Sequence, residues 1–200
     1  MRISAVCFAR IRDERGNYCL LLNKGRFTRG KGRILTPVGG ALEGMPEGMA
    51  FLRQLGATDF ESNLDLRFRI ADAQVAMVVS WFKRRNDERE CTVLHELRDE
   101  LGHETGTLTE NDMRGVRETF VKYHRYDAET QRDVPEKETA YLIEVFDVDM
   151  GSEATLKKLV AAASLPINER WVYFVSRREI ERRRTDDGVA IGPISRYILQ

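Results

Sequence analysis

The chain has 200 residues, 42% of them hydrophobic and 32% charged, a balance typical of one globular domain or of one domain with a sizeable insertion. Because 32 Lys and Arg balance 32 Asp and Glu, net charge gives no support for bulk nucleic-acid binding. No run approaches the ~18 apolar residues of a membrane span, and the N-terminal residues lack the apolar core of a signal peptide. Cys7, Cys19 and Cys91 are widely spaced in apolar patterns, which indicates reduced core residues of a cytoplasmic protein.

The first forty residues predict a hairpin followed by a glycine-rich basic segment. Residues 3–11 and 17–22 are apolar and favour strands, and residues 13–17 between them are turn-forming. Residues 24–33 then either grip phosphates or form an ordinary surface loop, and the sequence leaves both readings open. The basic residues of this segment are Lys24, Arg26, Arg29, Lys31 and Arg33.

Three elements are expected between residues 45 and 86. Residues 49–55 have a short helical pattern that Gly56 closes. Residues 64–70 alternate apolar and charged side chains, which predicts a half-buried strand. Residues 75–82 form a nearly unbroken apolar run, which predicts a buried strand.

Residues 88–102 predict an amphipathic helix. At about 100° per residue, its apolar side chains fall on one arc of about 120° that faces the core. These side chains are Cys91, Leu94, Leu97 and Leu101. Gly102 stands where a helix-terminating glycine belongs.

The acidic residues of this helix carry the candidate chemistry. Glu96 and Glu100 lie four residues apart, roughly opposite the apolar stripe, with Asp99 beside them. Arg89 lies two turns earlier on the same line. Carboxylates at this spacing repel by roughly 0.2–0.5 kcal/mol, and a hard divalent cation with oxygen ligands would offset the repulsion. A solvated acidic face is the alternative.

The second half of the chain predicts further strands and two capped helices. Strands are expected at residues 119–125, 139–146 and 171–176, and helices at residues 153–163, after Ser152, and from Arg177, after Ser176. The polar segment 126–138 is long for a structureless loop, which suggests that it serves a ligand. This order of elements predicts an α/β sandwich with a mixed sheet.

Two separated motifs resemble the halves of the Nudix box. Residues 95–102, H-E-L-R-D-E-L-G, resemble its R-E-U-x-E-E-x-G core, in which U is aliphatic, and residues 36–43, T-P-V-G-G-A-L-E, resemble its opening glycine turn and glutamate. The resemblance implies a Nudix-like α/β/α sandwich with a mixed sheet, a single domain over residues 1–200 in which an inserted lobe, residues 45–86, splits the box. The block D-L-R-F-R-I at residues 65–70, then W-F at 81–82, Arg89-Glu90 and the acidic helix resemble the SMODS-associated Nudix-like branch over residues 17–101. Members of this branch accompany nucleotide-second-messenger synthases in bacterial antiphage islands.

The resemblance implies a hydrolase of a nucleoside diphosphate-linked substrate that depends on Mg²⁺ or Mn²⁺. The implied metal ligands are Glu96, Glu100, Asp99 and the backbone of Gly40. The implied catalytic residues are Glu100, Asp99 and a glutamate of a later loop, Glu138 or Glu136. The implied substrate contacts are Gly39, Gly40 and Glu43, to which the basic and aromatic residues of the sequence add Arg89, Arg33 and Phe27.

Two departures from the family pattern leave other readings open. His95 replaces the arginine that pairs with an acid in the family, and Asp99 replaces a glutamate. A Nudix fold that senses a nucleotide without turnover is therefore the alternative, and a scaffold that binds another chain through the arginine-rich residues 177–184 is a third reading. The expected partner is a nucleotide, with no membrane; a homodimer and the identity of the substrate are left open.

Overall fold

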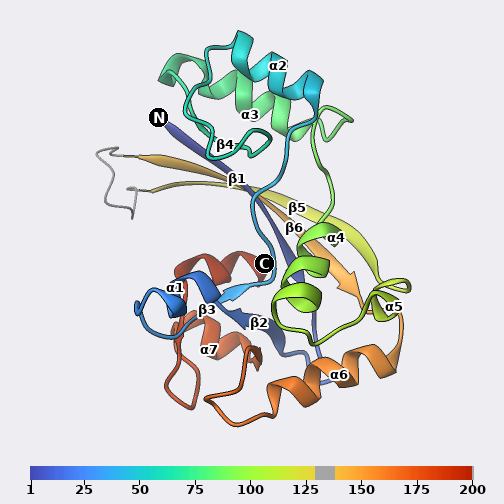
Figure 1. Cartoon of the computed structure of the whole chain (residues 1–200). Helices are drawn as coiled ribbons and strands as arrows, with labels where there is room; N and C mark the ends of the chain where they lie inside the picture. The colour runs from blue at the N-terminus through green and yellow to red at the C-terminus, as the bar shows by residue number, and fades with distance from the viewer. Residues whose placement is uncertain (129–137, 200) are drawn as a thin grey trace. The chain divides into compact units, whose positions relative to one another are not determined.

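The computed structural model describes residues 1–128 and 138–199, whose strands form two four-stranded sheets (Figure 1). The first sheet has the order β4-β1-β6-β5, from β1 (Arg2–Arg10), β4 (Arg67–Arg69), β5 (Arg117–Ala128) and β6 (Thr139–Asp149). The second has the order β7-β2-β3-β8, from β2 (Tyr18–Leu22), β3 (Ile34–Pro37), β7 (Val172–Val175) and β8 (Ala190–Ile191). Because β2 is antiparallel to both neighbours while β3 and β8 are parallel, this sheet is mixed, and the predicted mixed α/β class is confirmed.

The chain folds as two compact units. The first comprises Met1–Cys7, Gly40–Thr92 and Val121–Glu144, and the second comprises Phe8–Gly39, Val93–Phe120 and Val145–Gln200. The segment predicted as an inserted lobe, residues 45–86, falls entirely within the first unit. That it is an insertion into a single domain stays a prediction.

Two helices of the first unit, α2 (Pro46–Gln54) and α3 (Val75–Lys83), lie side by side (Figure 1). The ring of Phe51 stacks on that of Trp81, with 5.9 Å between centroids. A Cβ on Gly48 would lie 2.0 Å from the carbonyl oxygen of Glu88 and 2.9 Å from the Trp81 ring, so the helix can approach this closely only with glycine there. The predicted helix before Gly56, whose φ is +89°, is confirmed.

The prediction of a buried strand at residues 75–82 is wrong, because this segment is α3. Its buried residues, Val75, Val78, Trp81 and Phe82, recur with the three- to four-residue spacing of a helix, whereas Met77 is 45% exposed. A continuous apolar run cannot separate a buried strand from a buried helix, and the burial on one side shows which it is. The strand predicted at residues 64–70 is shortened to β4.

An arginine–glutamate pair lies in the core of the first unit. The Arg89 side chain is 0% exposed and that of Glu144 is 1% exposed, and Arg89 Nη2 donates to Glu144 Oε1 at 2.6 Å. Arg89 also donates to the carbonyl of Phe82, and its guanidinium lies 4.0 Å from the centroid of the Phe82 ring. The placement of Arg89 on the acidic helix is therefore wrong, because its guanidinium is held in the interior of the first unit.

The second unit begins with the turn predicted at residues 13–17. Asp13 Oδ1 accepts hydrogen bonds from the N–H groups of Arg15 and Asn17, and Gly16 has a φ of +79°. Arg12 and Tyr18 pair across the turn, but β1 and β2 belong to different sheets. The turn is confirmed, and the two-stranded hairpin is not.

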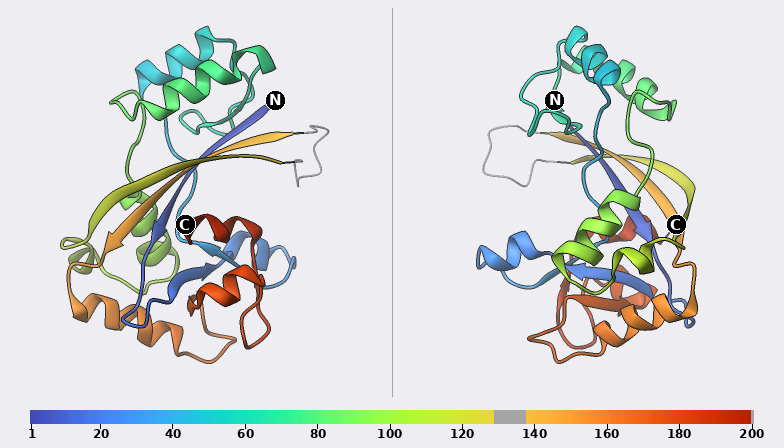
Figure 2. Two further views of the ribbon diagram at one scale, coloured as in Figure 1. Left: turned by 180° about the vertical axis from the view of Figure 1, so that it is seen from behind. Right: turned by 45° about the vertical axis from the view of Figure 1, so that its right-hand side comes forward.

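The C-terminal elements of the second unit follow the sequence prediction closely. Ser152 caps α6 (Glu153–Ala163), the orange helix low in both views of Figure 2, through the N–H of Thr155. Helix α6 packs on β7. Ser176 and Glu179 form a capping box at the start of α7 (Arg177–Glu181). Short elements complete the description: α1 (Lys24–Thr28), η1 (Asp72–Gln74), α5 (Glu110–Met113) and η3 (Pro193–Ile198). None of the helices in the described part of the chain combines the length and apolar character needed to cross a bilayer.

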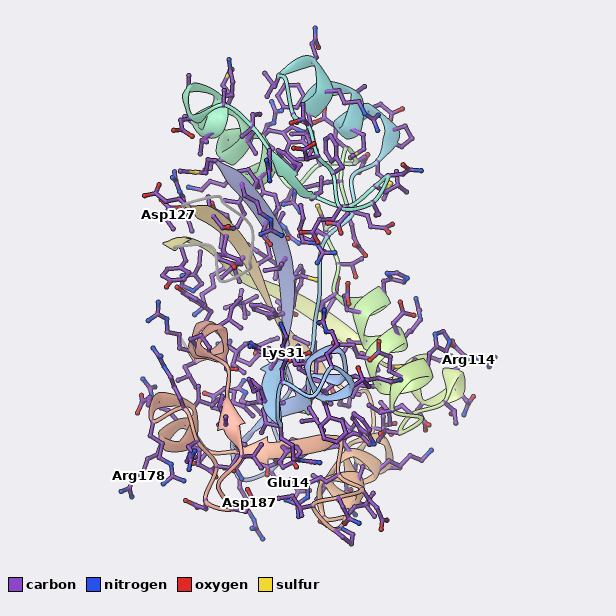
Figure 3. The ribbon with its side chains drawn as sticks, turned by 60° about the vertical axis from the view of Figure 1, so that its left-hand side comes forward. Glu14, Lys31, Arg114, Asp127, Arg178 and Asp187 are labelled. Carbon is purple, nitrogen blue, oxygen red and sulfur yellow. The ribbon has the colours of Figure 1, made fainter. Side chains whose placement is uncertain are left out.

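Glu144→Gln is expected to lower the free energy of unfolding by about 3–5 kcal/mol, because it leaves Arg89 charged and buried without its ionic partner. The matched control is Asp127→Asn, which breaks a pair with Arg125 whose side chains are 45% and 37% exposed (Asp127 is labelled in Figure 3). This control is expected to change stability by no more than ~1 kcal/mol. Urea unfolding of both variants checks the difference, and equal effects would show that the buried pair has no special role.

Candidate functional site

The acidic segment forms one continuous helical stretch, α4 (Leu94–Leu97) followed by the π-helix η2 (Arg98–Glu104). The helix therefore begins six residues later than the sequence predicted, and Cys91 lies outside it. Leu97 and Leu101 are fully buried, as expected for the apolar stripe. The Thr105 N–H donates to the carbonyl of Glu100 at 3.2 Å, the i→i+5 bond of a π-helix. Such wide turns are rare and are often found at functional sites.

A backbone hydrogen bond joins the two halves of the split motif. The N–H of Gly39, at the end of the second unit's first segment, donates to Glu100 Oε2 at 2.7 Å across 61 residues of sequence. Gly39 has a φ of +139°, a region that disfavours side chains and suits glycine. The prediction that this glycine turn lies against the acidic helix is thus met by Gly39.

The Glu100 carboxyl group has a raised pKa of about 8. Burial by the surrounding protein is the largest cause, the Gly39 hydrogen bond acts against it, and the charges of Glu96, Glu104 and Asp99 raise the pKa further. Burial raises the pKa of the Cys19 thiol as well, and the charge of Glu100 adds to that shift. In the absence of a cation Glu100 therefore holds a proton at neutral pH, and a bound cation would favour its ionised form.

Glu100 lines a pocket of about 160 Å³ in the second unit. Its wall combines apolar, hydroxyl, basic, acidic and aromatic side chains from β2, α1, β3, η2 and the residues next to them, and from the residue before β7. The residues are Leu21, Leu22, Asn23, Lys24, Gly25, Thr36, Glu100, Glu104, Thr105 and Trp171. Glu100 is partly buried as a residue and lines this pocket, which places its side chain where a ligand can meet it.

The carboxylate of Asp99 pairs with the two neighbouring histidines. His103 Nδ1 lies 3.0 Å from one carboxylate oxygen, and His95 Nε2 lies 3.4 Å from the other. The three side chains are 46–71% exposed. His95, where the family has arginine, thus pairs with an acid on the solvent side of the helix, and the role of Asp99 as a metal ligand or base stays a prediction.

Three other predicted site residues belong to the first unit. The Gly40 carbonyl accepts a hydrogen bond from the N–H of Cys7 at 3.0 Å. The Glu43 backbone pairs with Glu90, with 2.8 Å between Glu90 N and Glu43 O. Glu138 is exposed, and Glu136 lies outside the described residues. Their roles at a site remain predictions.

Arg33 and Phe27 support the pocket rather than line it. Arg33 Nη2 donates to the carbonyl of Arg170 and to the hydroxyl of Tyr173, each at 2.9 Å. Its guanidinium lies 5.3 Å from the centroid of the Phe27 ring, which meets Trp171 edge-on at 5.8 Å. Both residues thereby position the wall that contains Trp171.

Glu104 and Trp171 were not predicted as site residues. Glu104 could have been predicted from the sequence, because it follows Glu100 by four residues and therefore lies on the same side of the helix. Trp171 has no local signal. It reaches the pocket because its carbonyl accepts the N–H of Leu22 at 2.8 Å, at the edge of the β2–β7 pairing.

The pocket offers a cation few protein ligands. Within residues 1–128 and 138–199 no group of three or more His, Cys, Asp or Glu is arranged to hold a metal ion. Mg²⁺ commonly binds one or two carboxylates and completes its shell with water and substrate phosphates. Glu100 and Glu104 both line this pocket, so it would supply the one or two carboxylates of that mode.

Comparison with known proteins gives one match. The family model described as "SMODS-associated NUDIX domain" matches residues 1–199. No curated protein and no solved structure matches the chain.

Without divalent cations, the free energy of unfolding is expected to fall as pH rises from about 4.5 to about 8, because folded Glu100 then holds a proton that the unfolded chain releases. The slope from this group is at most ~1.4 kcal/mol per pH unit. Glu100→Gln, which mimics the protonated form, should lose this slope and exceed the wild type in stability at pH 8.

Urea unfolding between pH 5 and 8.5 measures the difference between the two proteins. His124, whose pKa burial lowers, titrates in both and cancels. Glu14→Gln, an exposed acid in the turn before β2 (Figure 3), should track the wild type. Parallel curves for wild type and Glu100→Gln would show that Glu100 titrates as an ordinary carboxyl group.

Proposed function

The chain belongs to the family of SMODS-associated NUDIX domains, and from this membership we propose that it is a metal-dependent hydrolase of a nucleoside diphosphate-linked substrate. The observation that carries the proposal is the 2.7 Å bond from Gly39 to Glu100, which brings the glycine turn and the acidic helix of the split motif together. We further propose that the protein acts in the cytoplasm, on a nucleotide used in antiphage defence.

Glu100 and Glu96 are the residues that we assign to a Mg²⁺ or Mn²⁺ ion. When bound, such an ion polarises phosphoryl oxygens and makes a water more acidic. The Gly39 N–H orients the Glu100 carboxylate, and the proximity of Glu96 is supported by the effect of its charge on the Glu100 pKa. Because two carboxylates leave most of a coordination shell to other oxygens, the diphosphate itself would complete the site.

Four other acids are candidate proton acceptors. Glu104 lines the pocket together with Glu100. Asp99 is the acid that the family motif places beside Glu100, but its carboxylate pairs with His95 and His103. We assign the proton-accepting role to Glu104, with Glu138 and Glu136 of the later loop as the alternatives that the family resemblance suggests.

A nucleotide sensor without turnover is the second candidate. It is favoured by His95, which replaces the motif arginine and pairs with Asp99 on the exposed side of the helix. A sensor would bind nucleotide and gain thermal stability by mass action, but release no product. A hydrolase does both.

The proposed function predicts product release from at least one of ADP-ribose, a dinucleoside polyphosphate and a nucleoside triphosphate, with Mg²⁺ or Mn²⁺ present. Glu100→Gln should abolish release while folding normally, and Glu14→Gln should keep wild-type activity. Mass-spectrometric detection of products checks both. Nucleotide binding without product in the wild type would support the sensor and contradict the hydrolase.

Glu104→Gln and Asp99→Asn separate the two assignments of the proton acceptor. If Glu104 serves the reaction, Glu104→Gln should lower kcat by about 100-fold or more, the range for a general base. Asp99→Asn should leave kcat within a few-fold, because its carboxylate is engaged by histidines. Steady-state kinetics on the best substrate gives the answer, and the reverse pattern would return the role to Asp99.

A further inference from the structure

The pocket beside Glu100 has two chemically different sides. Glu100 and Glu104 contribute carboxylates, whereas Lys24 contributes an ammonium group and Trp171 an indole ring. All four residues belong to the second unit. A ligand that fills this pocket therefore meets carboxylates on η2, an ammonium group on α1 and an aromatic ring just before β7.

The volume of the pocket limits which part of a ligand enters it. About 160 Å³ is close to the ~150 Å³ of a cavity that holds one benzene ring, and well below the ~300–1,000 Å³ of a site that encloses a drug-sized molecule. A whole dinucleotide does not fit. One aromatic ring matches this space, and the ribose and phosphates of a nucleotide would extend from it.

Lys24 is the basic residue of the glycine-rich segment that lines the pocket. Arg29 and Arg33 do not line the pocket, and their guanidinium groups donate to the carbonyls of Gly25 and Arg170. Lys31 lies on the loop that follows α1 and does not line the pocket (Figure 3). The sequence left open whether this segment grips phosphates, and the structure favours Lys24 for that contact.

Trp171 offers a pre-formed stacking surface. Its main chain is held to β2 by the 2.8 Å bond from Leu22, and its ring is braced by the edge-on contact with Phe27, which in turn lies under Arg33. A braced aromatic ring loses little conformational entropy when a ligand stacks on it. Every nucleobase has a π-face, so such a surface favours nucleotides over diphosphates that lack an aromatic ring.

We propose that Lys24 and Trp171 form the specificity subsite of this pocket, in which Trp171 stacks on a nucleobase and Lys24 binds a phosphate of the same nucleotide. The inference rests on the proposed function, because the diphosphate of the same nucleotide would bind at Glu100. It adds that the nucleobase, rather than the group linked to the diphosphate, occupies the pocket.

Trp171 provides its own probe. The chain has two tryptophans, and Trp81 is 2% exposed in the first unit. ADP and inorganic pyrophosphate are titrated into the protein with Ca²⁺ in place of Mg²⁺, and affinities are measured by calorimetry alongside tryptophan fluorescence. ADP should quench wild-type fluorescence, and Trp171→Phe should remove most of the quenching.

The variants separate the two contacts. Trp171→Ala should weaken ADP binding by about 5- to 150-fold, the range for loss of one base–aromatic stack, and leave pyrophosphate affinity unchanged within about twofold. Lys24→Met should weaken both ligands, whereas Lys31→Met, the matched control on the same segment, should weaken neither. Thermal melts establish that each variant is folded, and Trp171→Phe serves if Trp171→Ala is not.

Each outcome bears on one claim. Equal effects of Trp171→Ala on ADP and pyrophosphate, an unchanged ADP affinity, or no binding of ADP would overturn the subsite. ADP binding that depends on Trp171 in a protein that releases no product from any nucleotide would support the subsite and contradict the hydrolase. Product release together with an ADP affinity that does not change in Trp171→Ala would support the hydrolase and contradict the subsite.

Discussion

The hydrogen bond from Gly39 to Glu100 is the interaction on which the site depends. It holds a carboxyl group in a place that burial and three neighbouring negative charges make unfavourable for the ionised form. The fold thus orients the Glu100 carboxylate without supplying a positive charge to neutralise it. In the free protein a proton neutralises the group, and we propose that a bound cation takes the place of this proton. A backbone donor suits this purpose, because it fixes the carboxylate oxygen without bringing a positive charge that would compete with a metal ion.

The buried ion pair of the first unit shows the opposite solution for the same kind of residue. Glu144 is as buried as any acid in the described chain, but two arginines face it: Arg89 at 2.6 Å and Arg85 at 3.2 Å. The Arg89 guanidinium also donates to the carbonyls of Phe82 and Glu90 and lies over the Phe82 ring. Glu144 is thus a structural charge with its partners supplied by the protein, whereas we propose that Glu100 takes its partner from solution. This contrast is the physical basis for placing function at Glu100 and not at Glu144.

Most of the regular elements could be predicted from local patterns, and the site only in part. The capped helices after Ser152 and Ser176 follow from side chains adjacent in sequence, and the glycine turn and acidic helix follow from a motif. The apolar run that forms α3 misled because composition without periodicity does not separate helix from strand. Arg89 was misplaced because a helix was extended over residues that lie outside it. Trp171 and Lys24 share a pocket only because strand pairing and the turn into α1 bring them to it, which no local pattern records.

The most direct test is the pKa of Glu100 itself, measured by carboxyl-carbon NMR with and without Mg²⁺. The account predicts that the group titrates well above 4.5, near 8, in the metal-free protein, and that saturating Mg²⁺ shifts this titration to lower pH while the exposed Glu14 is unaffected. A Glu100 carboxyl that titrates near 4.5 and ignores Mg²⁺ would contradict it.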